Sequence, residues 1–264
     1  MNGRELSEAL RAGRRVYGTM VTSTSSRWVP AAAALGLDLV FIDTEHVAID
    51  RRMLSWMCRA YAASGVAPVV RIPSPDPYRA CMVLDGGAAG VIAPYVETPE
   101  QVQALRGAVK LAPLKGERLR RILAGREQPE GALADYLARR NAGKVLIVNI
   151  ESRPAMEALD DILAVPGLDA VLIGPNDLSL SLGIPERYFD AAFERAVETI
   201  LTKARAAGVG AGIHVVYPGG IEQEIRWGRL GANLILHEVD LIAFRKAMAA
   251  DLERLRRELG DAGG

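Results

Sequence analysis

Two stretches, VLIVNIE at residues 145–151 and VLIGPND at residues 171–177, are apolar runs that each end in a carboxylate. Such runs are too continuous for half-exposed strands and too short for most helices, which is typical of parallel strands covered on both faces. If they are neighbouring parallel strands, Glu151 and Asp177 emerge side by side at one rim of the sheet. Their hard oxygen ligands favour a divalent ion, Mg²⁺ or Mn²⁺. The alternative is that each carboxylate caps the helix that follows it.

Runs of this kind recur along the chain and alternate with helix-like stretches. They span residues 16–21, 37–43, 68–72, 90–94, 144–150, 169–174, 208–213 and 233–237. Helical patterns between them include residues 99–112, 154–164 and 189–208. Eight strand–helix units with right-handed crossovers close into a (β/α)₈ TIM barrel, which commonly takes about 250 residues. An open doubly wound sheet is the runner-up, but nothing resembles a Gly-rich dinucleotide turn. We therefore expect residues 1–264 to form one barrel domain.

The composition excludes some classes of partner. Half of the 264 residues are hydrophobic, enough for one large core, and 32 basic residues balance 32 acidic ones. No global field favours nucleic acid or a membrane surface, so small metabolites remain as partners. The first residues carry charge where a signal peptide has its apolar core, and no apolar run approaches the roughly 18 residues of a membrane span. These features predict a cytoplasmic protein with Cys58 and Cys81 as buried thiols.

Two segments fall outside the barrel pattern. About thirty residues, roughly 113–141, precede the fifth strand, and such long insertions are often lids or interface segments. The tail at residues 241–259 has apolar residues at helical spacing, which predicts an amphipathic helix. These apolar residues are Leu241, Phe244, Met248, Leu252, Leu255 and Leu259. The pattern leaves open whether this helix covers its own barrel or a neighbour's.

Reactive groups of such barrels come from the C-terminal ends of several strands. At these ends the sequence places Asp43, Glu45, His46, Arg71, Glu151, Asp177, His214 and His237. His46 follows Asp43 by three residues, and a histidine beside a carboxylate is a candidate general base or a structural pair. Arg71, inside an apolar strand, can hold an anion or form an ion pair within the barrel. The turn at residues 174–177 begins a helix and is a candidate site for a substrate carboxylate.

Several short strings in this chain match one enzyme family. They are FIDTEH at 41–46, VVR at 69–71, LDGG at 84–87, IE at 150–151 and IGPNDLS at 173–179. With these strings the chain resembles the HpcH/HpaI family of class II pyruvate aldolases over nearly its whole length. The resemblance implies a (β/α)₈ barrel whose last helix swaps between subunits, usually in a homohexamer built as a trimer of dimers.

The resemblance also implies how this chain holds its cofactor and substrate. Glu151 and Asp177 would bind the divalent metal, with Co²⁺ and Zn²⁺ as further candidates beside Mg²⁺ and Mn²⁺. The substrate would be a small 2-oxo acid together with an aldehyde. The candidate substrate-binding residues in this sequence are Asn149, Gly174, Pro175, Asn176 and His214.

Catalytic roles follow from the same resemblance. His46 would act as the base, Asp43 would lie close to it, and Asp85 from a neighbouring subunit would pair with it. Arg71 would stabilise the enolate oxygen of pyruvate. The metal stabilises the enolate when a 2-oxo acid chelates it, so no Schiff-base lysine is needed.

Three features depart from the family pattern. Asn149 stands where many members have glutamine, and KGER at residues 115–118 replaces a glycine-bearing loop that usually helps to close the site. His214 and His237 stand where aliphatic residues are common, so the wall facing the aldehyde is expected to be more polar. The pyruvate half of the site is therefore better supported than the aldehyde half.

The expected activity is reversible cleavage of a 4-hydroxy-2-oxo acid to pyruvate, or hydroxypyruvate, and an aldehyde. One alternative is other chemistry of the same enolate, such as oxaloacetate decarboxylation or a citrate-forming condensation. A second alternative, suggested by the altered loop at residues 115–118, is a non-catalytic barrel that binds a 2-oxo acid.

Overall fold

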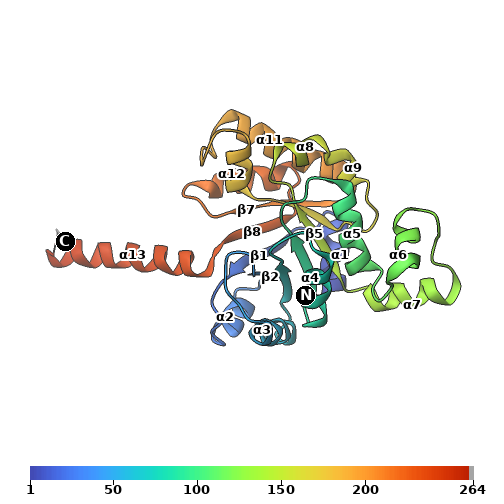
Figure 1. Ribbon diagram of the computed structural model, residues 1–264. Helices are drawn as coiled ribbons and strands as arrows, with labels where there is room; N and C mark the ends of the chain where they lie inside the picture. Colours follow the sequence, from blue (N-terminus) through green and yellow to red (C-terminus); the bar gives the residue numbers. More distant parts are fainter. Residues whose placement is uncertain (262–264) are drawn as a thin grey trace.

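The computed structural model describes residues 1–261 and contains a closed barrel of eight parallel strands in chain order (Figure 1). The strands are β1 Val16–Val21, β2 Leu39–Asp43, β3 Ala67–Arg71, β4 Gly90–Ala93, β5 Val145–Asn149, β6 Ala170–Ile173, β7 Gly210–Val215 and β8 Leu234–Val239. Each predicted run overlaps one strand, so the (β/α)₈ barrel prediction is confirmed. The barrel closes where β8 pairs with β1, as in the pair of Gly18 with Leu236.

Helices surround the barrel, and several begin with a side-chain cap. The helices are α1 Gly3–Arg11, α2 Trp28–Ala34, α3 Arg51–Ala63, α4 Pro77–Asp85, α5 Pro99–Lys110, α6 Gly116–Leu123, α7 Gly131–Asn141, α8 Arg153–Glu157, α9 Leu159–Leu163, α10 Pro175–Ser181, α11 Ala191–Ala206, α12 Gly220–Leu230 and α13 Asp240–Leu259. Asp50 caps α3, Asp76 caps α4, and Thr98 forms a capping box with Gln101 at α5. These caps fix where the loops at the C-terminal rim of the barrel end.

The interior of the barrel has its own core, separate from the layer between strands and helices. Inward-facing residues such as Phe41 and Ile147 pack with Leu6 and Leu10 of α1, so α1 closes the N-terminal end of the barrel. Side chains alternate between the two faces of a strand. The inward positions at the opposite, C-terminal rim are polar: Asp43 on β2, Arg71 on β3, Asn149 on β5 and His214 on β7.

Two predicted segments look different in the structure. The stretch at residues 154–164 forms two short helices, α8 and α9, because the chain leaves helical geometry at Ala158. The insertion at residues 113–141 forms α6 and α7, a helical hairpin at the side of the barrel (Figure 1). A small core of its own, built around Leu111, Ile122 and Leu137, holds this hairpin.

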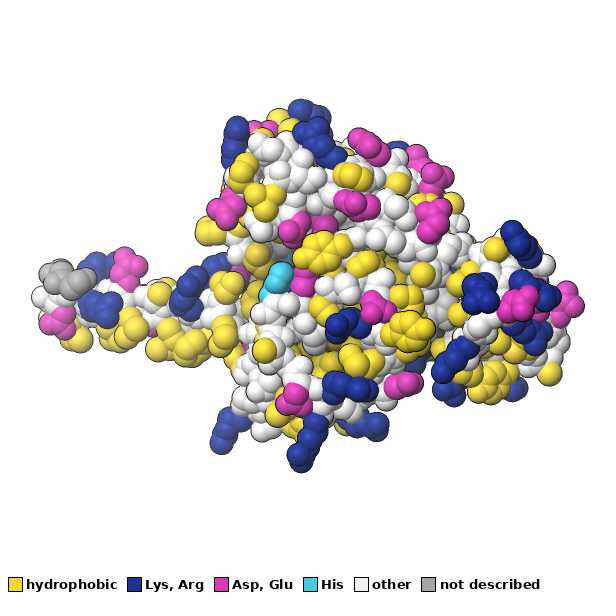
Figure 2. Space-filling model, viewed as in Figure 1, with side chains coloured by type: hydrophobic (Ala, Val, Ile, Leu, Met, Phe, Trp, Pro, Cys, Tyr) yellow, Lys and Arg dark blue, Asp and Glu magenta, His cyan; other side chains and the backbone are white. Residues whose placement is uncertain are grey.

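The C-terminal helix α13 projects away from the barrel (Figure 1). Its predicted apolar face is present but uncovered, and side chains from Leu252 to Leu259 along it are 40% to 72% exposed. Figure 2 shows these hydrophobic side chains along one edge of α13, and basic side chains gathered over the α6–α7 hairpin. Within residues 1–261, every helix is too short or too polar to cross a bilayer.

Candidate active site

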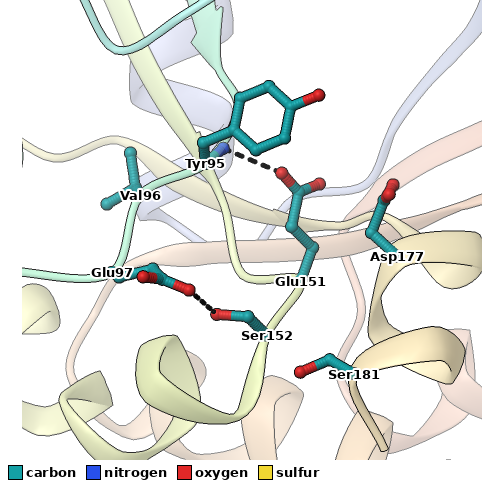
Figure 3. A pocket seen from close by; sticks show the side chains of 7 residues that line it. All are labelled: Tyr95, Val96, Glu97, Glu151, Ser152, Asp177 and Ser181. Atoms are coloured by element: carbon teal, nitrogen blue, oxygen red, sulfur yellow. Dashed lines mark hydrogen bonds between the residues drawn. The ribbon is translucent and has the colours of Figure 1, made fainter. Parts of the chain in front are cut away.

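A cavity of about 300 Å³ opens at the C-terminal rim of the barrel, between the loops that follow β4, β5 and β6 (Figure 3). Glu151 follows β5, and Asp177 lies in the first turn of α10 after β6. The chain thus brings together the two carboxylates that the sequence placed at adjacent strand ends. The cavity is lined by Tyr95, Val96, Glu97, Glu151, Ser152, Asp177 and Ser181.

Glu151 is only 6% exposed and is held by two hydrogen bonds. Its Oε1 accepts from the backbone N–H of Tyr95 at 2.8 Å, and its Oε2 accepts from Nδ2 of Asn149 at 2.8 Å (Figure 3 shows the first). Burial raises the pKa of Glu151, and the carboxylates of Asp177 and Glu45 raise it further. A cation at this rim would relieve that electrostatic cost.

Gly174 leaves a gap between the two carboxylates. A Cβ atom built on Gly174 would lie 2.5 Å from Oε2 of Glu151 and 3.6 Å from Oδ2 of Asp177. Both oxygens therefore converge on one small volume that any larger residue would fill. Among the described residues no cluster of three or more potential ligands exists. Two carboxylates fit a hard divalent ion that keeps its other positions for water and substrate, as Mg²⁺ usually does.

Arg71 lies at the C-terminal end of β3, two strands from β5 around the barrel. Its Nε lies 2.8 Å from Oδ1 of the fully buried Asp43 and 3.0 Å from Oε2 of Glu45. Its guanidinium also stands 5.1 Å from the ring centre of Phe41. The terminal nitrogens of Arg71 have no hydrogen-bond partner among residues 1–261, and the side chain is 14% exposed. The ion pair that the sequence allowed for is therefore present, and anion binding by the terminal nitrogens of Arg71 stays a prediction.

His46 and Asp43 are close, but their contact differs from the one expected. Asp43 accepts from the backbone N–H groups of Glu45 and His46, at 3.0 Å and 3.3 Å. The imidazole Nε2 of His46 instead lies 3.7 Å from Oε1 of Glu45. Its side chain is 65% exposed at the rim. The carboxylate beside this candidate base is therefore Glu45, while Asp43 shapes the loop.

Asp85 lies away from this group within the chain. It ends α4 and lines a second cavity, between α3 and α4, together with Arg51 and Arg52. No contact joins its carboxylate to His46 among the described residues. A pairing of the two residues would require a neighbouring subunit.

The predicted substrate-binding residues divide between the rim and the start of α10. Asn149 is buried, and its Oδ1 has no partner among the described residues. Gly174 precedes α10, Pro175 is buried as its first residue, and Asn176 is exposed at the rim. His214 faces the barrel interior, where its ring centre lies 5.4 Å from that of Phe41.

His237 does not face the barrel interior, so the sequence-based expectation of a second polar wall residue is wrong. The β8 residues Leu236 and Val239 occupy the interior core, and His237 points outward. Its Nδ1 lies 2.7 Å from Oε2 of Glu224 on α12. The alternation of the strand places it on the outer face.

Sequence reasoning missed Tyr95 as part of the site. Tyr95 adopts a left-handed φ of 56° just after β4, and this conformation presents its N–H to Glu151. The carboxylate of Glu45 beside its hydroxyl raises the pKa of Tyr95 to about 12. A strained non-glycine residue is common at functional sites. Nothing in the local sequence signals this conformation.

The fold and the rim define a barrel with two paired carboxylates and an arginine at the same rim, and comparison with known proteins identifies its family. The model of the family described as HpcH/HpaI aldolase/citrate lyase matches residues 17–237. A 2-keto-3-deoxy-L-rhamnonate aldolase of Salmonella gallinarum (strain 287/91 / NCTC 13346) is 34% identical over 245 residues, which cover 93% of this chain and 90% of that protein.

Solved structures give the same result. An HpcH/HpaI aldolase from Desulfitobacterium hafniense DCB-2 has a TM-score of 0.81 at 28% identity, covering 95% of this chain and 96% of that chain. The citrate synthase SbnG has a TM-score of 0.81 at 30% identity, covering 97% and 98%. The chain therefore belongs to the HpcH/HpaI aldolase/citrate lyase family and is a lyase of the aldolase type.

Proposed function

We propose that this enzyme is a divalent-metal-dependent aldolase that reversibly cleaves a 4-hydroxy-2-oxo acid to pyruvate, or hydroxypyruvate, and an aldehyde. The observation that carries the proposal is the convergence of the Glu151 and Asp177 carboxylates on the gap at Gly174. Mg²⁺ or Mn²⁺ suits these oxygen ligands best, with Co²⁺ or Zn²⁺ as further candidates. When bound, the ion supplies positive charge beside the carboxylate and keto oxygen of the 2-oxo acid.

The residues of the rim then have distinct tasks. In the cleavage direction the C4 hydroxyl loses its proton, the C3–C4 bond breaks, and its electrons move to the C2 oxygen as an enolate. The terminal nitrogens of Arg71 bind that oxygen, because they are free while Asp43 and Glu45 hold Nε. His46 accepts the proton, with Glu45 near its imidazole. C3 of the enolate then takes up a proton to give pyruvate.

Neighbouring residues position the Glu151 carboxylate and the substrate. Asn149 holds Oε2 of Glu151. Gly174, Pro175 and Asn176 form the turn beside the two carboxylates. We propose that this turn seats the carboxylate of the substrate.

The assembly is part of the proposal. We propose that α13 swaps between subunits of a homohexamer built as a trimer of dimers, and that the partner subunit's Asp85 pairs with His46. The uncovered apolar face of α13 and the place of Asp85 at the end of α4, beside a separate cavity, support this arrangement. We also propose that the enzyme acts in the cytoplasm, which the free thiols Cys58 and Cys81 support.

Exchange of the C3 protons of pyruvate with D₂O tests the proposal without any aldehyde. We expect NMR to detect exchange with Mg²⁺ or Mn²⁺, its loss with EDTA, and its return when metal is restored. Arg71→Ala should slow exchange by about 10²- to 10³-fold, because it removes charge from the developing oxyanion. Arg71→Lys, which keeps the charge without the planar fork, serves as the matched control and should lose less. Exchange at the wild-type rate in Arg71→Ala would make Arg71 a structural ion-pair residue.

A second candidate function is a condensation or decarboxylation that uses the same enolate. The similarity to the citrate synthase SbnG, at 30% identity over nearly the whole chain, favours keeping this alternative. Pyruvate release from a synthetic 4-hydroxy-2-oxo acid, measured beside carbon dioxide release from oxaloacetate, separates the two functions.

A further inference from the structure

Tyr95 lines the cavity in a backbone conformation that residues other than glycine seldom adopt. Its φ of 56° lies in the left-handed region, two residues after β4. Its N–H donates to Oε1 of Glu151 at 2.8 Å, and its carbonyl oxygen accepts from Nε2 of Gln101 at 3.4 Å. The side chain is nevertheless 52% exposed, so packing alone does not explain a large aromatic residue at this strained position.

The side chain of Tyr95 connects the metal-binding side of the cavity to the loop after β2. Its ring extends over the cavity, away from Val96 and Glu97 (Figure 3). Its hydroxyl lies beside the carboxylate of Glu45, whose hydrogen bonding and charge are the largest causes that raise the pKa of Tyr95. A phenol beside a carboxylate is the donor, because an ionised carboxylate can only accept.

Glu45 is the third carboxylate near the proposed metal position. Its charge, like that of Asp177, raises the pKa of Glu151, so the three carboxylates stand close to one another. Oε2 of Glu45 lies 3.0 Å from Nε of Arg71 but has no hydrogen bond among residues 1–261. Arg71 therefore attracts Glu45 without fixing the direction of its carboxylate.

A third carboxylate on the ion would oppose the chemistry proposed for this site. A 2-oxo acid takes two positions on the ion, through its carboxylate and its keto oxygen. Carboxylates are good ligands for Mg²⁺ and Mn²⁺, so Glu45 on the ion would bind the metal more tightly and exclude one of the substrate oxygens. The described residues contain no group of three or more potential metal ligands, so Glu45 is held back from the other two carboxylates.

Building on the proposed metal-dependent function, we propose that Tyr95 is a positioning residue that keeps Glu45 off the metal ion. Its hydroxyl donates to the Glu45 carboxylate, while its N–H holds the carboxylate of Glu151 at the metal position. Tyr95 thus separates a carboxylate that binds the ion from one that does not. The coordination positions that the 2-oxo acid needs stay open, and Glu45 stays beside Arg71 and His46.

Tyr95→Phe tests the proposal, because it removes the hydroxyl and keeps the ring and the backbone N–H. Without pyruvate, we expect calorimetry to show Mn²⁺ bound about 10-fold more tightly than by the wild type, because Glu45 becomes a further ligand. Pyruvate should bind the Mn²⁺-loaded variant about 10-fold more weakly, because it must displace Glu45. The water-proton relaxation caused by bound Mn²⁺ should also fall, since Glu45 replaces a bound water. None of these measurements depends on turnover.

Three further variants keep the test decisive. Tyr136→Phe is the matched control, because it removes a phenol hydroxyl from α7 at the side of the barrel and should keep both affinities. Tyr95→Leu also lacks the hydroxyl and should show the same gain in Mn²⁺ affinity. In the double variant Tyr95→Phe/Glu45→Gln the Mn²⁺ affinity should return to within about 2-fold of the wild type, since a neutral amide is the poorer ligand.

The direction of the change separates this role from a merely structural one. A hydroxyl that only supports the site would leave Mn²⁺ binding unchanged or weaker when it is removed, and either result in Tyr95→Phe would overturn the inference. If the wild type exchanges the C3 protons of pyruvate in D₂O, that result overturns the inference alone. A wild type that neither binds Mn²⁺ nor exchanges these protons would overturn the proposed function as well.

Discussion

The position of Glu151 favours metal binding and lowers the stability of the metal-free protein. Its carboxylate is buried, receives two hydrogen bonds and faces a second carboxylate at Asp177. Its raised pKa means that the charged form destabilises the folded state. The stabilising contribution of the protonated form is present at low pH and is lost as the pH rises through the folded pKa.

Glu151→Gln should therefore stabilise the metal-free protein at pH 7 while abolishing metal binding. The new amide can donate to Oδ1 of Asn149, which has no partner among the described residues, once the Asn149 amide turns over. In EDTA we expect the melting temperature at pH 7 to rise by about 2–4 °C for each kcal/mol gained. The difference should shrink towards pH 4, where Glu151 itself becomes neutral.

Asp177→Asn is the matched control for this prediction. Asp177 is exposed and makes no hydrogen bond or ion pair among residues 1–261, so its replacement removes only the repulsion on Glu151. It should weaken Mn²⁺ binding and raise the melting temperature by less than Glu151→Gln does. Mn²⁺ affinity is measured by calorimetry in the presence of pyruvate. Unchanged Mn²⁺ affinity in both variants would show that these carboxylates do not hold the metal.

The sequence predicted the positions of those site residues that lie at or just after the ends of strands. Glu151, Asp177 and Arg71 follow from the rule that parallel strands of a barrel present their carboxyl ends at one rim. Tyr95 could not be found this way, since its left-handed backbone depends on the loop that Gln101 holds from α5. The direction of the His46 side chain could not be predicted from the sequence either. Its imidazole lies near Glu45, while Asp43 accepts a hydrogen bond from its backbone N–H.

At the scale of elements, the start of α13 is tied to the loop that follows β1. Asp240 is buried, and its carboxylate accepts from the backbone N–H and hydroxyl of Thr22 at 3.1 Å and 2.7 Å. It also accepts from the N–H of Ser23 at 2.9 Å and from that of Leu241 at 2.8 Å. One carboxylate thus connects the projecting helix to a loop at the C-terminal rim.

Asp240→Ala should destabilise the protein by about 2–3 kcal/mol, because it leaves several buried donors without an acceptor. Chemical denaturation measures that loss. Hydrogen exchange should also become faster at the amides of Thr22 and Ser23. Asp251→Ala, on the exposed part of the same helix, should change neither quantity. Equal exchange at Thr22 in both variants would contradict the proposed connection.

Elements with strong periodicity were predictable, and those decided by tertiary contacts were not. The 3.6-residue pattern gave α13 almost to the residue, since the prediction of 241–259 compares with Asp240–Leu259. The stretch at residues 154–164 has a helical pattern too, yet it breaks at Ala158 into α8 and α9. The insertion at residues 113–141 lacked a pattern that would reveal the α6–α7 hairpin, whose small core forms only after folding.

At the scale of the whole molecule, α13 is an element that the single chain does not cover. Exposed leucines, a phenylalanine and a methionine lie three or four residues apart on one face of a helix about 30 Å long. A continuous apolar stripe of this kind marks an interaction surface. A second copy of the chain is the occupant that the proposed swap requires, and the same assembly would bring Asp85 towards His46.

Ending the chain after Ala243 should therefore break the assembly and the activity together. This truncation keeps Asp240 and its hydrogen bonds, and it keeps Ile242, which packs on the interior core, so the barrel itself should remain folded. Light scattering should show a hexamer for the full chain and a smaller species for the truncated one. Pyruvate C3 exchange should fall by about 10²-fold or more, as for loss of a general base, if the partner subunit's Asp85 supports His46. Arg254→Glu, a change of charge on the same helix outside its apolar stripe, is the control and should leave the hexamer intact. A truncated protein that is monomeric and fully active would exclude both the swap and the shared site.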